Sequence, residues 1–510
     1  MIQGIGLTLE YPMKSLLSLL CLTAAATAQT ILAQPYLQPG PQGTLEATDE
    51  MRVIWVTDQT PGNFTVEYAP KGSKLIPAKM ETAAMDFTAA VAKTPVTQEK
   101  DQHYIRYSAA LPGLPLDSSF TYVVKLDGKV VREQTTHTRA SASKPTRFIM
   151  IGDLADGKAS QNVIAYQMSL QKPHYTVLLG DIIYPTGRAY HYMKYFWSTY
   201  SNPTEPSEKN GAPMMATVPF YAVLGNHDAL MGKLTTFSDA YAAYHFFNAP
   251  QNGLPEGVWN TAIPKSEAAT KFRALAGKNY PALGFYSFDY GAAHIVVLDN
   301  SGGGKSDDPA VMAWLDQDLK ATKQPWKFVA LHVPPFQVTV AHYSAQRQRK
   351  FAPILEANGV DVVFAGHVHN FQRSKPLRFL PATGVAAAVA AKPVPNDPKT
   401  NVQSLAPNTP SSYVNGAFTL DETFDGAKNT RPNGVIYVVQ GGGGAKLYTG
   451  TVDKNLAKLP NGGKDNYAPF NAKHYDTLHS FSVIDLTAKK FEMRTINEKG
   501  EEIDRCVIEK

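Results

Sequence analysis

The first part of the chain, residues 31–139, alternates hydrophobic and polar residues in short runs. The alternation is clearest at 51–56, 63–68 and 120–125, and it is typical of strands that bury one face. Turn-forming Pro-Gly and Asp-Gly pairs separate the runs, and helical periodicity is not found there. About 110 residues of this kind predict a β-sandwich domain.

A different pattern follows residues 141–145, which we interpret as a linker. Apolar runs of strand length now alternate with helical stretches, which predicts a layered α/β domain. One helix is expected at 309–321, where Asp308 can cap the first turn and Pro309 suits its first position. Residues 375–433 are rich in Ala, Pro, Asn and Thr without periodicity, and we expect a long surface insertion there.

Length and composition narrow the class of protein. A chain of 510 residues is too long for one ordinary core, and 44% hydrophobic with 18% charged residues excludes a disordered protein. The 49 basic and 44 acidic residues form no basic run, so no nucleic-acid partner is expected. Two cysteines exclude a disulfide scaffold, whereas 13 histidines offer metal ligands.

The N-terminus has the pattern of a secretory signal peptide. Residues 13–28 combine Met13-Lys14, a short apolar run and a small-residue end at Ala28. We therefore expect residues 1–28 to be a signal, with translation starting at Met13, and the mature protein to be periplasmic or secreted. The run is shorter than the roughly 20 residues that span a membrane, so no stable membrane anchor is expected. A helix buried in the fold is the alternative.

Five apolar, strand-like runs each end in residues that can bind metal ions. Loops converge at the carboxyl ends of strands in α/β folds, and sites are built there. One such junction is usually a turn, but five at the same end of their strands predict a shared metal site. The junctions are Gly152-Asp153, Gly180-Asp181, Gly225-Asn226-His227-Asp228, His332 and Gly366-His367-Val368-His369.

Aspartate, asparagine and histidine are suitable donors for two divalent or trivalent ions joined by a bridging carboxylate. Such a pair clamps a phosphate oxygen and lowers the pKa of a bound water, and the resulting hydroxide can attack phosphorus in line. The sequence therefore predicts phosphate-ester hydrolysis at a dinuclear centre.

In the same order, these junctions resemble the blocks of the calcineurin-like metallophosphoesterases, specifically of the purple acid phosphatase branch. The family blocks read Asp-x-Gly, Gly-Asp-x-x-Tyr, Gly-Asn-His-Asp/Glu, Val-x-x-His and Gly-His-x-His, and this chain departs from them only at Ala155. The resemblance implies a catalytic domain at 145–510, built as a layered ββ sandwich flanked by helices. Residues 29–144 resemble the fibronectin type III-like domain that precedes it in long members.

The resemblance also implies the metals and their ligands. Tyr184 stands where purple acid phosphatases use a phenolate, a hard and negative donor that favours Fe(III) at the first site. The second site would hold Zn, Fe, Mn or another divalent ion. Packing of Tyr184 against Pro185 is the alternative. The implied ligands are Asp153, Asp181, Tyr184 and His369 for the first ion, and Asp181, Asn226, His332 and His367 for the second.

Three further residues receive catalytic roles from the resemblance. His227 would contact the phosphate or protonate the leaving group, and Asp228 would orient His227. His342 stands where similar enzymes place a histidine over the substrate, with an exposed loop histidine as the alternative. The glycine run at 441–446 could line the site as a turn, although a flexible loop is the favoured interpretation.

We therefore expect an exported phosphatase that hydrolyses phosphate monoesters of a small phosphorylated substrate by attack of a metal-bound hydroxide. One alternative is a phosphodiesterase or nucleotidase on the same scaffold. Another is a degenerate hydrolase domain that serves as an extracellular binding protein, although all seven ligand positions are present. No oligomeric state is assigned.

Overall fold

The computed structural model describes residues 29–87, 101–229, 234–235, 237–258, 265–301, 308–343, 345–381, 414, 416–451 and 469–510. The expected signal peptide at 1–28 lies outside them, as does most of the expected insertion at 375–433. The described part of that insertion includes the antiparallel pair β17 (Leu377–Pro381) and β18 (Gly416–Leu420). Across the described residues, we find no helix that is both long and apolar enough to cross a membrane.

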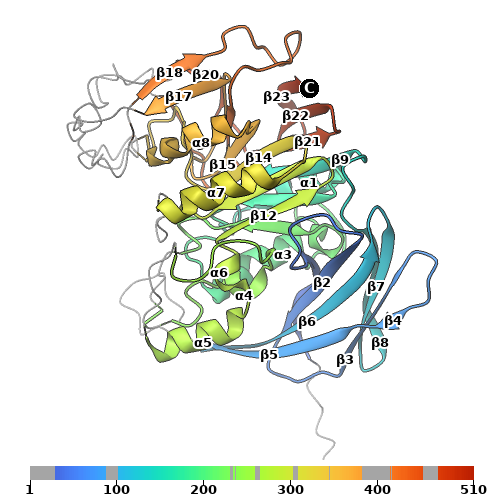
Figure 1. Ribbon diagram of the computed structural model, residues 1–510. Helices are drawn as coiled ribbons and strands as arrows, with labels where there is room; N and C mark the ends of the chain where they lie inside the picture. The colour runs from blue at the N-terminus through green and yellow to red at the C-terminus, as the bar shows by residue number, and fades with distance from the viewer. Residues whose placement is uncertain are drawn as a thin grey trace, which may run out of the picture.

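The N-terminal part is a sandwich of two antiparallel four-stranded sheets (Figure 1). Aromatic side chains fill its core: Trp55 stacks on Tyr107 at 5.2 Å between ring centroids, and Phe64 from the opposite sheet meets Trp55 edge-on. The predicted alternation therefore places one face of each strand in this core. The strand order is β1 (Ile31–Pro39), β2 (Thr48–Thr57), β6 (Gln102–Pro115), β5 (Lys79–Phe87) in one sheet and β4 (Ile76–Pro77), β3 (Phe64–Pro70), β7 (Ser119–Leu126), β8 (Lys129–His137) in the other.

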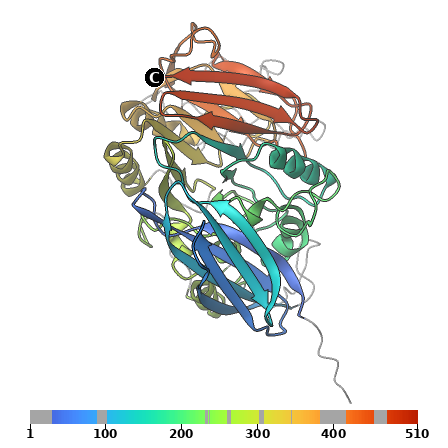
Figure 2. The ribbon, with the colours of Figure 1, turned by 90° about the vertical axis from the view of Figure 1, so that its right-hand side faces the viewer.

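The C-terminal part packs a six-stranded sheet against a seven-stranded sheet, and Figure 2 shows the last three strands side by side in red. Phe148 and Phe328 meet across the sandwich at 6.1 Å, and Tyr221 stacks on Phe288 at 3.8 Å. The strand order is β11 (Phe220–Val223), β10 (Tyr175–Leu179), β9 (Thr146–Ile151), β21 (Ser480–Leu486), β22 (Lys490–Asn497), β23 (Glu502–Glu509) in the first sheet and β12 (Phe285–Tyr290), β13 (Ala293–Leu298), β14 (Trp326–Leu331), β15 (Val362–Ala365), β19 (Ile436–Gln440), β16 (Phe371–Ser374), β20 (Asn471–Tyr475) in the second.

Parallel strands dominate the centre of both sheets. In the six-stranded sheet β9, β10 and β11 are parallel, and in the seven-stranded sheet β13, β14, β15 and β19 are parallel. The carboxyl ends of strands from both sheets are thereby available to one site, as the sequence predicts.

Helices cover the sandwich and confirm the expected layering. The helix predicted at 309–321 is present as α7, and Asp308 caps it by accepting a hydrogen bond from the Ala310 N–H at 2.9 Å. Its residues Val311 and Leu315 belong to the core over the seven-stranded sheet. The helices are α1 (Ala159–Leu170), α2 (Ala189–His191), π-helical η1 (Tyr192–Phe196), α3 (Trp197–Tyr200), 3₁₀-helical η2 (Met214–Ala216), α4 (Ala243–Phe246), α5 (Glu267–Ala276), α6 (Asn279–Ala282), α7 (Pro309–Ala321), 3₁₀-helical η3 (Arg347–Phe351) and α8 (Ala352–Ala357).

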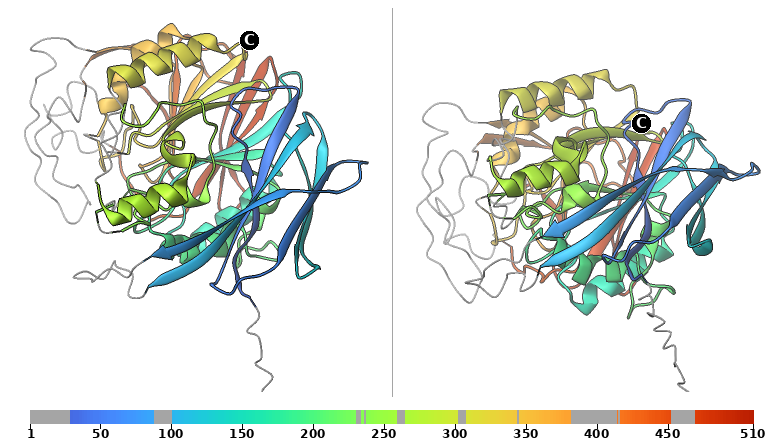
Figure 3. Two further views of the ribbon diagram at one scale, coloured as in Figure 1. Left: turned by 60° about the horizontal axis from the view of Figure 1, so that its bottom comes forward. Right: turned by 90° about the horizontal axis from the view of Figure 1, so that it is seen from below.

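The two parts are packed against each other (Figure 3). Tyr36 of β1 stacks on Trp197 of α3 at 4.5 Å and donates a hydrogen bond to the Phe246 carbonyl at 2.9 Å. Arg139 is buried, pairs with Asp49 at 2.9 Å and donates to backbone carbonyls. The fold class is confirmed, whereas the domain limits at 29–144 and 145–510 stay predictions.

Candidate metal centre

The residues predicted to bind metal come together where five strands end. Asp153 follows β9, Asp181 follows β10, Asn226 follows β11, His332 follows β14, and His367 with His369 follows β15. Their candidate donor atoms form two groups, each with all atoms within 4.8 Å of one another. One group is Asp181, His332 and His367, and the other is Asp153, Asp181 and His369, so Asp181 belongs to both.

Tyr184 lies in the middle of the second of these groups. Its hydroxyl is 3.0 Å from Oδ1 of Asp153, 3.0 Å from Oδ2 of Asp181 and 3.1 Å from Nε2 of His369. This placement contradicts the alternative that Tyr184 only packs against Pro185. Three candidate donor atoms thus lie within 3.1 Å of the Tyr184 oxygen.

The other group is completed by an amide oxygen. Nε2 of His332 lies 3.1 Å from Oδ1 of Asn226 and 3.3 Å from Oδ1 of Asp181. The ring of His367 is 5.0 Å from the ring of His332. The structure therefore brings all seven predicted ligands into one connected cluster.

The backbone conformation at these strand ends is unusual. Asp153, Asp181 and His367 have φ angles of 61°, 47° and 68°, in the left-handed region that residues with a side chain rarely adopt. Gly180 has φ 84°, and a Cβ there would lie 2.4 Å from Nδ1 of His332. Such strain is typical of functional sites, where it aims side chains that regular structure would turn away.

Backbone carbonyls orient two of the imidazoles. Nδ1 of His332 is 2.8 Å from the Leu179 carbonyl, and Nδ1 of His369 is 2.7 Å from the Lys446 carbonyl. A carbonyl can only accept, so each Nδ1 carries a proton, and Nε2 is the nitrogen of each ring that faces the cluster and can bind a metal ion. Metal-binding histidines have this arrangement, and the donor set fits a pair of metal ions.

The electrostatics of the cluster favour positive charge. Burial alone would lower the pKa of His332, but Asp181 and other partners raise it to about 9. Burial alone would raise the pKa of Asp181, but His332 and two further histidines lower it below its ordinary value. Burial, Asp153 and Asp181 all raise the pKa of the Tyr184 hydroxyl well above its ordinary value. The phenol therefore keeps its proton unless a cation bound at the cluster displaces it.

Two histidines without a place in the ligand groups lie at the edge of the cluster. The ring of His227 is 4.4 Å from that of Tyr184, and its Nδ1 is 2.8 Å from the Pro185 carbonyl. The ring of His342 is 4.4 Å from that of His367, and burial, followed by His369, lowers the pKa of His342 to about 4. His342 is half-buried and lies beside a predicted metal ligand, so it is not the exposed loop histidine that was the alternative.

Asp228 has contacts other than those expected. It is buried and accepts hydrogen bonds from the N–H groups of Gly225 and Ile182 and from the Tyr192 hydroxyl. The described contacts of the His227 ring do not include Asp228. The expectation that Asp228 orients His227 directly is therefore corrected, because successive side chains of this loop diverge: Asp228 fixes the backbone around Asp181.

Sequence reasoning missed residues that complete the site. Tyr448 stacks on His369 at 4.1 Å and lies 5.4 Å from His342. Asn300 accepts hydrogen bonds from the His332 and Val333 N–H groups through Oδ1. It follows strand β13, so the same strand-end signal could have identified it.

Backbone hydrogen bonds fix the glycine run at 441–446 beside the metal cluster. Gly443 donates to the Gly152 carbonyl at 3.0 Å, and Ala445 donates to the Asp153 carbonyl at 3.1 Å. A Cβ on Gly441 would lie 2.7 Å from Oδ2 of Asp153. The flexible-loop interpretation was therefore wrong, because these close approaches need glycine and fix the turn beneath Asp153.

Known proteins are similar to this chain in sequence and in fold. Residues 140–371 match the model of the calcineurin-like phosphoesterase family. An uncharacterized protein of Mycobacterium tuberculosis is 24% identical over 412 residues, covering 74% of this chain and 68% of its own. Purple acid phosphatase 18 of Arabidopsis thaliana is 22% identical over 389 residues, covering 71% and 76%.

A solved structure shows the same fold over most of the chain. Purple acid phosphatase PPD1 from yellow lupin (Lupinus luteus) seeds superposes with a TM-score of 0.55 at 16% identity, covering 93% of this chain and 74% of that one. The resemblance stated from the sequence motifs is thus confirmed. Residues 140–371 therefore form a calcineurin-like phosphoesterase domain, and the chain resembles purple acid phosphatases in sequence and in fold.

Proposed function

We propose that the protein is an exported phosphatase that hydrolyses phosphate monoesters at a dinuclear metal centre. The observation that carries this proposal is the position of Asp181, which belongs to both donor groups and so can bridge two ions. The family and its purple acid phosphatase relatives imply such a pair of metals and a phosphoester substrate.

The chain offers each ion a different environment. Asp153, Tyr184 and His369 would complete the first site, and a phenolate among them favours Fe(III). Asn226, His332 and His367 would complete the second, which suits Zn, Fe, Mn or another divalent ion. When bound, the two ions would supply Lewis-acid activation of the phosphate ester and of water.

The surrounding residues would bind the ester and handle its protons. Because Nδ1 of His227 lies at the Pro185 carbonyl, its Nε2 is the nitrogen that can give a proton to the leaving oxygen. His342, beside His367, would contact a phosphate oxygen. Asp228 would keep the Asp181 loop in place.

Metal analysis combined with a substrate pair tests this proposal. The purified protein should contain close to two metal ions per chain and should hydrolyse p-nitrophenyl phosphate faster than bis(p-nitrophenyl) phosphate. A preference for the diester would favour the phosphodiesterase alternative instead. Full metal occupancy without turnover of either ester would favour a binding protein.

Export has a separate test. The protein recovered from the periplasm or medium of the producing cells should begin near Gln29, because residues 13–28 have the pattern of a cleaved signal. N-terminal sequencing measures this directly. Recovered protein that still begins at Met1 or Met13 would contradict it.

A further inference from the structure

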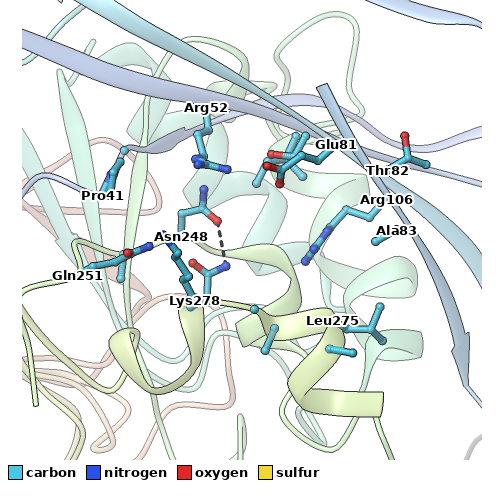
Figure 4. A pocket seen from close by; sticks show the side chains of 18 residues that line it. Pro41, Arg52, Glu81, Thr82, Ala83, Arg106, Asn248, Gln251, Leu275 and Lys278 are labelled. Carbon is cyan, nitrogen blue, oxygen red and sulfur yellow. Dashed lines mark hydrogen bonds between the residues drawn. The ribbon is translucent and has the colours of Figure 1, made fainter. Parts of the chain in front are cut away.

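A polar cavity of about 440 Å³ lies between the N-terminal β domain and the C-terminal domain. Strands β2, β5 and β6 form one wall, and the segment at 248–251 with the end of α5 and start of α6 forms the other (Figure 4). None of the predicted metal ligands lines it. Its volume is within the range of small-molecule sites, roughly 300–1,000 Å³.

The charged side chains of this interdomain cavity are predominantly basic. Arg52 and Arg106 come from the β domain and Lys278 from the catalytic domain, whereas Glu81 is the one acidic residue among those lining the cavity. Arg52 also lies 3.4 Å from Glu50, outside the lining, so part of its charge is compensated. Positive charge from both domains nevertheless remains in excess.

Arg106 is a half-buried cation of this cavity, and its described hydrogen bond goes to an uncharged acceptor. Its Nη1 donates to the backbone carbonyl of His245 at 2.6 Å, which is a neutral acceptor. Among the described residues, no carboxylate lies within ion-pair distance of its guanidinium. Burial lowers the pKa of Arg106, Arg52 lowers it too, and Tyr36 and Glu81 oppose the change. Because the side chain is still partly accessible, its remaining N–H donors can meet a ligand.

Neutral donors complete the lining. Nδ2 of Asn279 donates to Oδ1 of Asn248 at 2.9 Å, which leaves the Asn248 amide N–H groups for another acceptor. Figure 4 shows Arg52, Arg106, Asn248 and Lys278 extending toward the same space. Arginine and lysine donors with amides around them recognise phosphate and carboxylate oxygens.

We propose that this interdomain cavity binds a small oxyanion, a phosphate- or carboxylate-bearing molecule, held by Arg52 and Arg106 from one domain and Lys278 from the other. The ligand joins the two domains, and its site is distinct from the metal centre. Glu81 is the acidic residue of the lining, and it disfavours a negative group placed directly against its carboxylate.

Calorimetry on the metal-loaded protein tests the proposal, with inorganic phosphate and succinate as probes. Wild type should bind two phosphates per chain, one at the metal centre and one in the interdomain cavity. Arg52→Gln/Lys278→Gln should bind the second phosphate about tenfold or more weakly, because it loses two charge-assisted contacts. Inhibition of p-nitrophenyl phosphate hydrolysis by phosphate should not change, since it reports the metal centre.

The matched control is Lys129→Gln/Lys271→Gln, which removes two exposed lysines outside the cavity lining. It should keep both phosphates. Succinate binding that depends on Arg52 and Lys278, without a second phosphate, would support the site and identify carboxylates as its ligands. A wild type that binds one phosphate and no succinate would overturn the proposal, as would a second phosphate retained at full affinity by Arg52→Gln/Lys278→Gln.

Discussion

The Tyr184 hydroxyl donates a hydrogen bond to the Asp181 carboxylate at 3.0 Å although only two residues separate them. Gly180 and Asp181 both have left-handed backbone, which bends the chain directly after β10. Ile183 then pairs with Ala155, and the Tyr184 N–H donates to the Ala155 carbonyl at 2.9 Å. The spacing of the Gly-Asp-x-x-Tyr block therefore lets the bent segment run on beside Ala155 and brings the phenol to the carboxylate. Ala155 takes part in this arrangement through backbone hydrogen bonds and not through its side chain.

Asp181→Asn should reduce kcat/KM by several orders of magnitude. Both donor groups lose the carboxylate they share, while the substituted amide keeps the size of the side chain. Metal content per chain should fall with activity, and circular dichroism should show a folded protein. Asp86→Asn, at an exposed aspartate of the β domain, is the control and should change neither quantity. Near-normal turnover with metal still bound would contradict the bridging role.

His227→Ala should keep both metal ions but lose activity in a substrate-dependent way. A general acid typically contributes ~100- to 10,000-fold, and that contribution matters most when the leaving group is poor. We therefore expect a large loss in kcat for alkyl phosphates and a smaller loss for p-nitrophenyl phosphate. Equal losses for the two esters would instead indicate that His227 only binds the phosphate.

His294 should make the stability of the catalytic domain depend on pH. Its Nδ1 lies 2.7 Å from Asp289 and its Nε2 lies 2.9 Å from Asp318. Burial alone would lower its pKa, but the two carboxylates raise the pKa of His294 to about 9. A raised pKa means that the folded state binds the proton more tightly than the unfolded state. The stabilisation is therefore complete below the unfolded pKa of about 6.5 and is lost as pH rises through about 9.

The measurement is urea unfolding of wild type and His294→Gln at about pH 6 and about pH 10. The difference in free energy of unfolding between the two proteins should be roughly 3 kcal/mol at the lower pH and should shrink at the higher pH. His103→Gln is the control, because His103 pairs with Asp86 at the surface, where such a pair contributes at most about 1 kcal/mol. A pH-independent difference for His294→Gln would refute the charged state of His294.

The strand-end junctions allowed most of the fold and the metal cluster to be predicted. Apolar runs followed by Asp, Asn or His are local features, and the parallel arrangement brings them together without any further information. Adjacency in sequence was a poor guide inside the loops, as Asp228 shows: its carboxylate turns toward Gly225 and Ile182 while the neighbouring His227 contacts Pro185.

Contacts between distant segments could not be predicted in the same way. Tyr448 reaches the site because its N–H donates to the His369 carbonyl at 2.9 Å, and it lies in an irregular segment without a pattern. The interdomain cavity combines Arg52, Arg106 and Lys278 from three unrelated places in the chain. A basic cavity built from such distant residues can be recognised only when the packing of the two domains is known.

The first metal site should hold Fe(III). The hydroxyl of Tyr184 is within 3.1 Å of three candidate ligand atoms, and its raised pKa keeps the proton in place until a strongly polarising cation binds. A trivalent ion provides that polarisation better than a divalent one. Phenolate bound to Fe(III) absorbs visible light by charge transfer, so protein produced with iron available should be pink to violet.

Tyr184→Phe should bleach this band, because the ring remains and only the donor oxygen is lost. Tyr448→Phe is the matched control: its ring stacks on His369 at 4.1 Å, yet the described hydrogen bonds of the predicted ligands involve the hydroxyl of Tyr184 and not that of Tyr448, so the band should persist. The visible spectrum and iron content of wild type and the two variants show whether Tyr184 binds the first ion, and neither measurement depends on turnover. A colourless wild type that holds only divalent metal, with full activity in Tyr184→Phe, would show that the phenol does not bind the first ion. Loss of colour in Tyr448→Phe alone would transfer the assignment to Tyr448.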